Sequence, residues 1–170
     1  MAKNRVLYEG ALTSDTARTI NENLSDYCLC TTQLDVASST TFASVDGLTS
    51  GTLEPGVYEF VIQLGTVSTA NCGIKFAILQ NTASMISAIE YNATMFSASG
   101  VGAGRGTTVT SGSAIATSAS GAIVNTRITG TMTVALAGTI TVQMAQATSH
   151  ADTASVFVGS YMKLNRIKAQ

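Results

Sequence analysis

The chain is poor in the residues from which most catalytic and metal sites are built. Its 170 residues include one histidine, His150, and no tryptophan, and only 11% are charged, against roughly 25% in an average soluble domain. A Ser/His/Asp or Cys/His site would have to use His150, which lies in the polar stretch ATSHADTAS. His150 and Asp152 alone offer too few ligands for a tight metal site. We therefore expect no enzyme activity, no catalytic residue, no metal site and no cofactor.

Long runs of one kind of residue are also missing. No cluster of Lys or Arg occurs and the formal net charge is −1, which argues against nucleic-acid binding. No stretch approaches the ~20 consecutive apolar residues of a membrane span. The first residues, MAKNRVLYEG, have no apolar core of a secretory signal. We expect neither nucleic acid nor membrane as a partner, and synthesis in a cytoplasm.

Two short motifs resemble functional ones but lack their defining residues. The segment Gly100–Gly106, GVGAGRG, lacks the Lys and Ser/Thr of a phosphate-binding loop. Phosphate binding also needs a helix behind the glycines, and none is predicted, so we expect a mobile surface loop. Cys28, Cys30 and Cys72 fit neither a disulfide framework nor a zinc site in number and spacing. We expect them to be buried thiols.

Alternation of apolar and polar residues is the dominant pattern from Thr31 onward, and it predicts β-strands. It is sharpest in VYEFVIQL, after the turn Glu54–Gly56. The residues expected on one apolar face of each strand are Tyr58, Phe60, Ile62, Leu64, Ile74, Phe76, Ile78, Ile89, Tyr91, Ala93, Met95, Val124, Ile128, Met132, Val134, Leu136, Ile140, Val142, Met144, Val156, Val158, Met162 and Leu164. Length and about eight such strands predict one all-β domain, an antiparallel β-sandwich.

The run from Leu136 to Ile167 predicts a hairpin-like pair of closing strands. The last of these, from Val156 to Asn165, has apolar or aromatic residues on both faces. A strand with one wet face does not need a second apolar face. We expect a central strand, with one face on the core and the other on a neighbouring subunit.

Residues 1–30 hold a large share of the charge. The stretch TSDTARTINENLSDY predicts a short helix, with Thr13 or Ser14 as its cap and one apolar stripe ending at Leu24 and Tyr27. A short helix with one apolar stripe must pack on something. We therefore divide the chain into an N-terminal arm with a short helix, residues 1–30, and a sandwich domain, residues 31–170.

Three segments resemble small structural proteins of tailed bacteriophages. They are NRVLYEGALTSDTARTINENL, TLEPGVYEFVIQL followed by CGIKFAI, and GTITVQMAQATSHADTASVFVGSYMKLNRI. The resemblance implies a jelly roll of the tumour-necrosis-factor type, a homotrimer, and a place in a virion assembled in a bacterial cytoplasm. Such domains serve as capsid decoration (cement) proteins or as tips of head or tail fibres, so the resemblance indicates fold better than role.

The resemblance also suggests which residues contact partners. In a trimer packed around a three-fold axis, the second apolar faces would form the interface, which gives Val57, Val61, Phe157 and Tyr161. A decoration protein on the capsid exterior would bind the major capsid protein through its arm, which gives Arg5, Leu7, Tyr8, Leu12, Arg18, Ile20 and Leu24. The arm could instead pack on its own domain or on a sister subunit.

Two functions remain open at this point. The first is a trimeric decoration protein that stabilises the assembled shell. The second is a receptor-binding fibre tip that recognises a host glycan or protein. The short N-terminal segment and the 6% of aromatic residues favour decoration.

Overall fold

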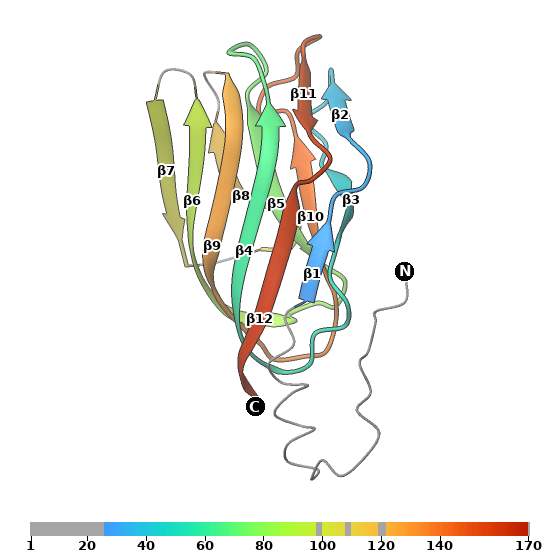
Figure 1. The fold of residues 1–170 in the computed structure, drawn as a ribbon, viewed down its shortest axis with the longest axis vertical. Coiled ribbons are helices and arrows are strands. Elements are labelled where there is room, and N and C mark those ends of the chain that lie inside the picture. The colour runs from blue at the N-terminus through green and yellow to red at the C-terminus, as the bar shows by residue number, and fades with distance from the viewer. Residues whose placement is uncertain (1–25, 98–99, 108–109, 119–121, 170) are drawn as a thin grey trace.

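The computed structural model describes residues 26–97, 100–107, 110–118 and 122–169, and every helix or strand within these ranges is a β-strand (Figure 1). The strands are β1 (Asp26–Leu29), β2 (Leu34–Ala37), β3 (Ala43–Thr49), β4 (Gly56–Val67), β5 (Ile74–Gln80), β6 (Ile86–Ser97), β7 (Gly100–Gly106), β8 (Ala114–Ser118), β9 (Ile123–Val134), β10 (Ile140–Ala145), β11 (Thr153–Val156) and β12 (Tyr161–Ala169). The predicted all-β class is confirmed. The N-terminal helix was expected to reach Tyr27, but Tyr27 lies in strand β1; residues 13–25 lie outside the described part.

The strands form two antiparallel sheets. The large sheet has the order β1-β12-β4-β9-β6-β7, with β11 paired to β4 and β2 paired to β11. The small sheet has the order β3-β10-β5-β8. In Figure 1 the small sheet lies behind the large one. The arrangement is that of a β-sandwich.

The core fills the space between the sheets and follows the predicted alternation. In β4 the side chains of Tyr58, Phe60, Ile62 and Leu64 are buried, and the residues between them are half-buried or exposed. β5 and β6 contribute Ile74, Phe76, Ile78, Ile89, Tyr91, Ala93 and Met95, as predicted. Full burial of one large apolar side chain contributes roughly 1.5–3 kcal/mol, so these inner faces hold the sheets together.

Leu136 and Val158 lie outside the strands and are exposed, contrary to the prediction. Val124 is a further error in the predicted core. Its side chain is exposed, and Ile123 is buried instead. The register between β6 and β9 shifts at this point, because Phe96 pairs with Asn125 whereas Ser97 pairs with Ile123. One extra residue in β9 forms a bulge, which reverses the alternation on one side of it.

The segment Gly100–Gly106 is a strand rather than a loop. β7 pairs with β6 from Tyr91↔Gly106 to Ser97↔Gly100 and forms one edge of the large sheet. Gly106 pairs with Tyr91, whose side chain is buried, and a Cβ atom at Gly106 would lie 2.3 Å from the Tyr91 hydroxyl oxygen. Glycine is needed there because the Tyr91 ring occupies that space.

The two closing runs do not form a hairpin. β10 lies in the small sheet between β3 and β5, whereas β11 and β12 lie in the large sheet. The expected single strand Val156–Asn165 is two strands, separated by a turn in which Ser160 N–H donates to Phe157 O at 3.2 Å. The central position predicted for the last strand is confirmed, because β12 lies between β1 and β4.

β1 is fixed to both sheets along one lateral edge. It pairs with β12 from Asp26↔Leu164 to Leu29↔Tyr161. The Cys28 thiol donates to Thr49 O at 3.3 Å, across to β3. Because β1 and β12 are antiparallel, Asp26 lies toward the pole of the sandwich at which β12 ends (Figure 1). We call this the entry pole.

Candidate interaction surface

The outer face of the large sheet, the side directed away from the core, carries the predicted interface residues. It consists of the alternate residues of each strand, so its composition follows from the register. One row across the sheet is Leu29, Tyr161, Gln63, Arg127 and Thr94, and the next is Tyr27, Lys163, Val61, Thr129 and Asn92. This outer face combines apolar side chains with Thr, Asn and Gln.

All four residues predicted for a trimer interface lie on this face. Tyr161 and Val61 are diagonal neighbours, because Tyr161 pairs with Gln63 and Val61 pairs with Lys163. Phe157 packs over Gly65, where an added Cβ would lie 3.8 Å from the Phe157 Cβ. Val57 lies farther along β4, toward the entry pole. The structure therefore places Tyr161 between the positions of Val61 and Phe157, and Val57 at the other end of β4 on the same face.

An apolar cluster surrounds Tyr161, and we call it the tyrosine patch: Tyr27, Leu29, Phe157 and Tyr161. The rings of Tyr27 and Tyr161 are stacked, with centroids 5.3 Å apart and planes at 20°. Tyr27 is 57% exposed, and Leu29 and Phe157 are exposed as well. The sequence interpretation missed Tyr27 and Leu29, because it placed the first on a helix and the run Asp26–Leu29 is too short to show alternation.

A second apolar cluster occupies the opposite edge of the same sheet, and we call it the valine patch: Phe96, Val101 and Val124. Phe96 and Val101 are cross-strand partners on β6 and β7. Val124 is exposed in the adjoining bulge, and Val101 is 63% exposed. The glycines around Val101 concealed this strand from hydropathy analysis, so the patch was not predicted.

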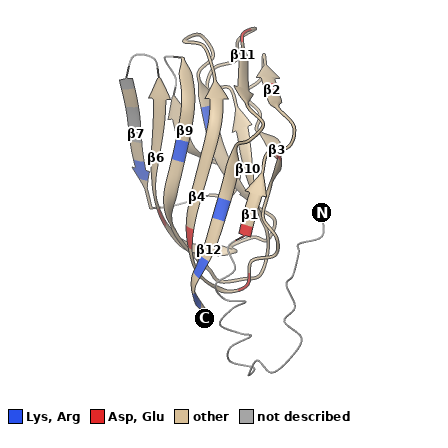
Figure 2. Ribbon diagram, in the orientation of Figure 1, with Lys and Arg blue, Asp and Glu red and all other residues tan. Residues whose placement is uncertain are grey.

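Charged side chains are sparse on this face (Figure 2). Glu59, Arg127 and Lys163 lie at outward positions of β4, β9 and β12. Glu90 and Arg105 form an exposed ion pair between β6 and β7. Both signs occur, so two copies of the face would not repel each other strongly.

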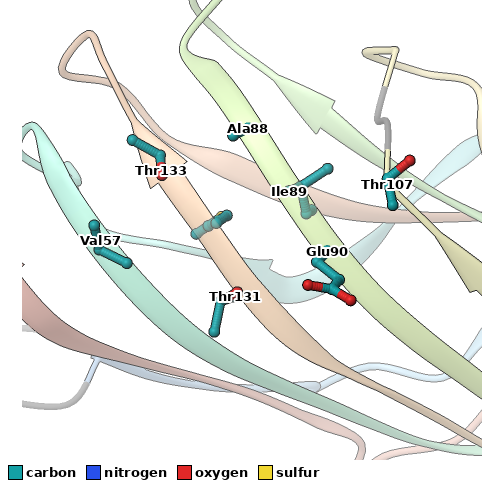
Figure 3. A pocket seen from close by; sticks show the side chains of 8 residues that line it. Val57, Ala88, Ile89, Glu90, Thr107, Thr131 and Thr133 are labelled. Atoms are coloured by element: carbon teal, nitrogen blue, oxygen red, sulfur yellow. The ribbon is translucent and has the colours of Figure 1, made fainter.

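A shallow pocket of ≈ 330 Å³ lies on the same face between β4, β9 and β6 (Figure 3). Its lining residues are Val57, Ala88, Ile89, Glu90, Thr107, Thr131, Met132 and Thr133. The threonine hydroxyl groups can donate or accept hydrogen bonds, and the Glu90 carboxylate can accept them from a polar group. Val57, one of the predicted interface residues, forms a wall of this pocket.

The pole opposite the entry pole is organised by one buried amide, that of Gln146. Its Oε1 accepts hydrogen bonds from Ser39 N–H and His150 N–H, both at 3.1 Å. Its Nε2 donates to His150 O at 3.1 Å and to Asp152 O at 2.6 Å. All four hydrogen-bonding positions of the amide are used, so Gln146 ties two loops together.

Asp152 is held in the same region by polar side chains. Thr69 Oγ1 donates to Asp152 Oδ2 at 2.6 Å, and Asn71 Nδ2 donates to it at 3.0 Å. Both hydrogen bonds lower the pKa of Asp152 because they favour the charged carboxylate, and the one from Thr69 has the larger effect. Asp152 N–H donates to His150 Nδ1 at 3.1 Å, so His150 packs locally against this turn.

All three cysteines are buried, as expected, and none of them forms a disulfide. Burial raises the pKa of the Cys30 thiol, whose Sγ donates to Thr32 O at 3.2 Å. In the described ranges no group of three or more His, Cys, Asp or Glu side chains is placed to hold a metal ion. No helix long and apolar enough to cross a membrane occurs in the described part of the chain.

The residues predicted to bind a capsid lie outside the described residues. They are Arg5, Leu7, Tyr8, Leu12, Arg18, Ile20 and Leu24. The described part of the segment 1–30 includes β1, which is a strand of the large sheet.

No protein-family profile matches the chain, and no curated protein matches its sequence.

Proposed function

We propose that this chain is a trimeric structural protein of a bacteriophage virion, which binds the outside of the assembled capsid and stabilises it. It has no catalytic task, and its partners are its own copies and the major capsid protein. The observation that carries the proposal is the position of Val61, Phe157 and Tyr161 together on one outer sheet face. An apolar face of this kind on a sandwich fits burial against other subunits.

The strand pairing supports a jelly roll as the subunit fold. The first strand pairs with the last, β1 with β12, and further pairs follow inward: β3 with β10, β4 with β9, and β5 with β8. Nested antiparallel pairs distributed over two four-stranded sheets are the connectivity of a jelly roll. β6 and β7 are then an added hairpin between β5 and β8 that widens one sheet.

The position of Asp26 supports a role for the preceding residues in anchoring. The chain enters the sandwich at the entry pole, so three subunits around one axis would present three N-terminal segments at the same end. Three linked contacts bind much more tightly than one, because the second and third are made at high effective concentration. A protein that binds only the assembled shell stabilises that state by mass action.

A co-sedimentation experiment with assembled empty capsids tests the proposal. We expect the full chain to pellet with the shells and to raise the temperature at which they disassemble. A chain lacking residues 1–25 keeps β1 and should no longer pellet with them. Lys168→Glu, a charge reversal in β12 near the same pole, serves as the control and should still bind. Full occupancy by the shortened chain would refute the anchoring role.

The alternative is a receptor-binding fibre tip. Immunogold labelling of virions separates the two functions, because a decoration protein covers the head and a fibre tip lies at the end of a fibre. Label confined to the tail would reject decoration. In that case the loops organised by Gln146, at the pole away from Asp26, become the first place to look for a receptor contact.

A further inference from the structure

We propose that copies of this chain join head to tail through the outer face of the large sheet, with the tyrosine patch of one copy against the valine patch of the next. This inference rests on the proposed trimer, and it adds which residues are in contact and that the contact is head to tail. The occupant of each patch is a second copy of this chain.

The two patches are separate and differ in composition. β1 and β7 are the two edges of a six-strand path, so five spacings of ~4.8 Å put them about 24 Å apart. Most outward residues between them are polar, among them Gln63, Asn125 and Thr94, and Val57 and Val61 of β4 are apolar exceptions. The Gln63 amide donates to Asn125 Oδ1 at 2.5 Å. One face therefore offers two unlike apolar patches with a polar band between them.

This distribution favours a ring over a two-fold dimer. In a closed ring every contact joins two different patches of neighbouring subunits, whereas a two-fold contact joins a patch to itself. If the outer faces turn toward a common axis, the β1 edge of one sheet lies beside the β7 edge of the next. The polar band then lines the axis, where water can hydrate it.

The area of the outer face is divided between two neighbours. Six strands at ~4.8 Å spacing, with the long strands rising ~3.3 Å per residue, give a face on the order of 1,000 Å². Each contact can therefore use at most about 500 Å² per partner, or about 1,000 Å² in total, which is the lower end for a specific interface. The aromatic rings supply area at little entropic cost, because Tyr27 and Tyr161 already hold each other by stacking.

Cysteine cross-linking of the full chain tests whether the tyrosine patch of one copy lies against the valine patch of the next. The native thiols are buried, and the wild-type chain gives the background. Tyr27→Cys and Val101→Cys are made separately and together, and each protein is treated with a thiol linker much shorter than 24 Å. We expect the double variant to form covalent dimers and trimers, and each single variant to stay monomeric on a denaturing gel.

A matched pair controls for random collision. Tyr27→Cys combined with Leu79→Cys places the second thiol on β5 of the small sheet, at an exposed position, and should give no ladder. Covalent dimers from a single variant would show a two-fold contact and overturn the proposal. A double variant that forms no covalent dimers or trimers would also overturn the proposal. That result is expected if residues 1–25, rather than a second copy, cover the patches.

Native mass provides a second readout. The wild-type chain should sediment as three copies of 17.5 kDa, and Tyr161→Asp should sediment as one, because a buried unpaired charge opposes association. Leu79→Asp should remain trimeric. If Tyr161→Asp fails to fold, Tyr27→Asp, at a more exposed position, takes its place. A wild-type monomer that still binds shells would refute the trimer and this inference but leave the capsid-binding role standing, and a cross-linked trimer that ignores shells would refute only the capsid-binding role.

Discussion

The buried amide of Gln146 donates to the main-chain oxygen of Asp152 at 2.6 Å. The same amide nitrogen donates to His150 O, and the amide oxygen accepts two N–H groups. One side chain at the end of β10 therefore holds two loops in a single conformation. Its replacement gives the sharpest stability test in the molecule.

Gln146→Glu should destabilise the fold by about 3–5 kcal/mol at neutral pH, because a buried carboxylate would face two carbonyl oxygens without a hydrogen to donate. Urea unfolding followed by circular dichroism measures the loss. Gln143→Glu, the same change at a half-buried position of β10, should cost less than about 1 kcal/mol. Acid should narrow the difference between Gln146→Glu and wild type, since a protonated carboxyl group can donate one hydrogen bond. A Gln146→Glu protein as stable as wild type would contradict the network.

Gly130→Ala should destabilise the large sheet. A Cβ atom at Gly130 would lie 2.0 Å from Glu90 O and 2.8 Å from Tyr91 Cα, so β6 and β9 would have to separate. Overpacking of this kind costs about 1–3 kcal/mol. Gly104→Ala in the edge strand β7 meets nothing within 4 Å and should change stability by less than about 0.5 kcal/mol. Thermal melts of both variants measure the contrast; equal melting temperatures would argue against the close approach.

Thr126→Val should stabilise the protein. In the part of the chain that the structure describes, Thr126 Oγ1 is buried without a hydrogen-bond partner, and valine has nearly the same shape. Removing an unsatisfied buried hydroxyl should raise the unfolding free energy by about 1 kcal/mol. Thr133→Val, on the outer face of the same strand, serves as the control and should give no comparable gain. A loss of stability in Thr126→Val would mean that its hydroxyl has a partner such as a bound water.

Asp152 should make the unfolding free energy depend on pH. Hydrogen bonds from Thr69 and Asn71 put the pKa of the folded-state carboxyl below its ordinary value. The charged form therefore stabilises the fold above the unfolded-state pKa of about 3.9, and that stability is lost as pH falls through the folded-state pKa.

Asp152→Asn removes this ionisation. The variant should be less stable than wild type at about pH 6 and should approach it at about pH 2. Urea titrations at a series of pH values measure the two slopes. Glu54→Gln, at an exposed position before β4, controls for the loss of one negative charge. Parallel curves for Asp152→Asn and wild type would show that the hydrogen bonds do not favour the carboxylate.

The buried and outward faces of the long strands could be predicted because successive side chains point to opposite sides of a sheet, so one buried position determines the face of the others. Phe60 and Ile62 follow this rule. Val124 escapes it, because a bulge depends on pairing with β6 and not on the β9 sequence alone. Val101 was hidden because glycine carries no hydropathy signal, and β7 forms by pairing with β6.

The partners of each strand could not be predicted either. β10 alternates as regularly as β4, yet it belongs to the other sheet. Sheet membership depends on contacts between residues far apart in the chain, which local alternation does not encode. For the same reason Tyr27 was placed on a helix: its strand conformation comes from pairing with Lys163 of β12. The outward positions of Val61 and Tyr161 could be predicted from the sequence because β4 and β12 have apolar residues on both faces, and Phe157 lies on the same face although it belongs to the turn between β11 and β12.

The pairing of β1 with β12 has a consequence for synthesis. The amino-terminal strand stays without its neighbour until residue 164 has left the ribosome, because Asp26 pairs with Leu164. Folding governed by such distant pairing is slow compared with folding driven by local contacts. A nascent chain therefore cannot complete the tyrosine patch until β12 has emerged, because Tyr161 lies in that strand and Tyr27 and Leu29 pair with it.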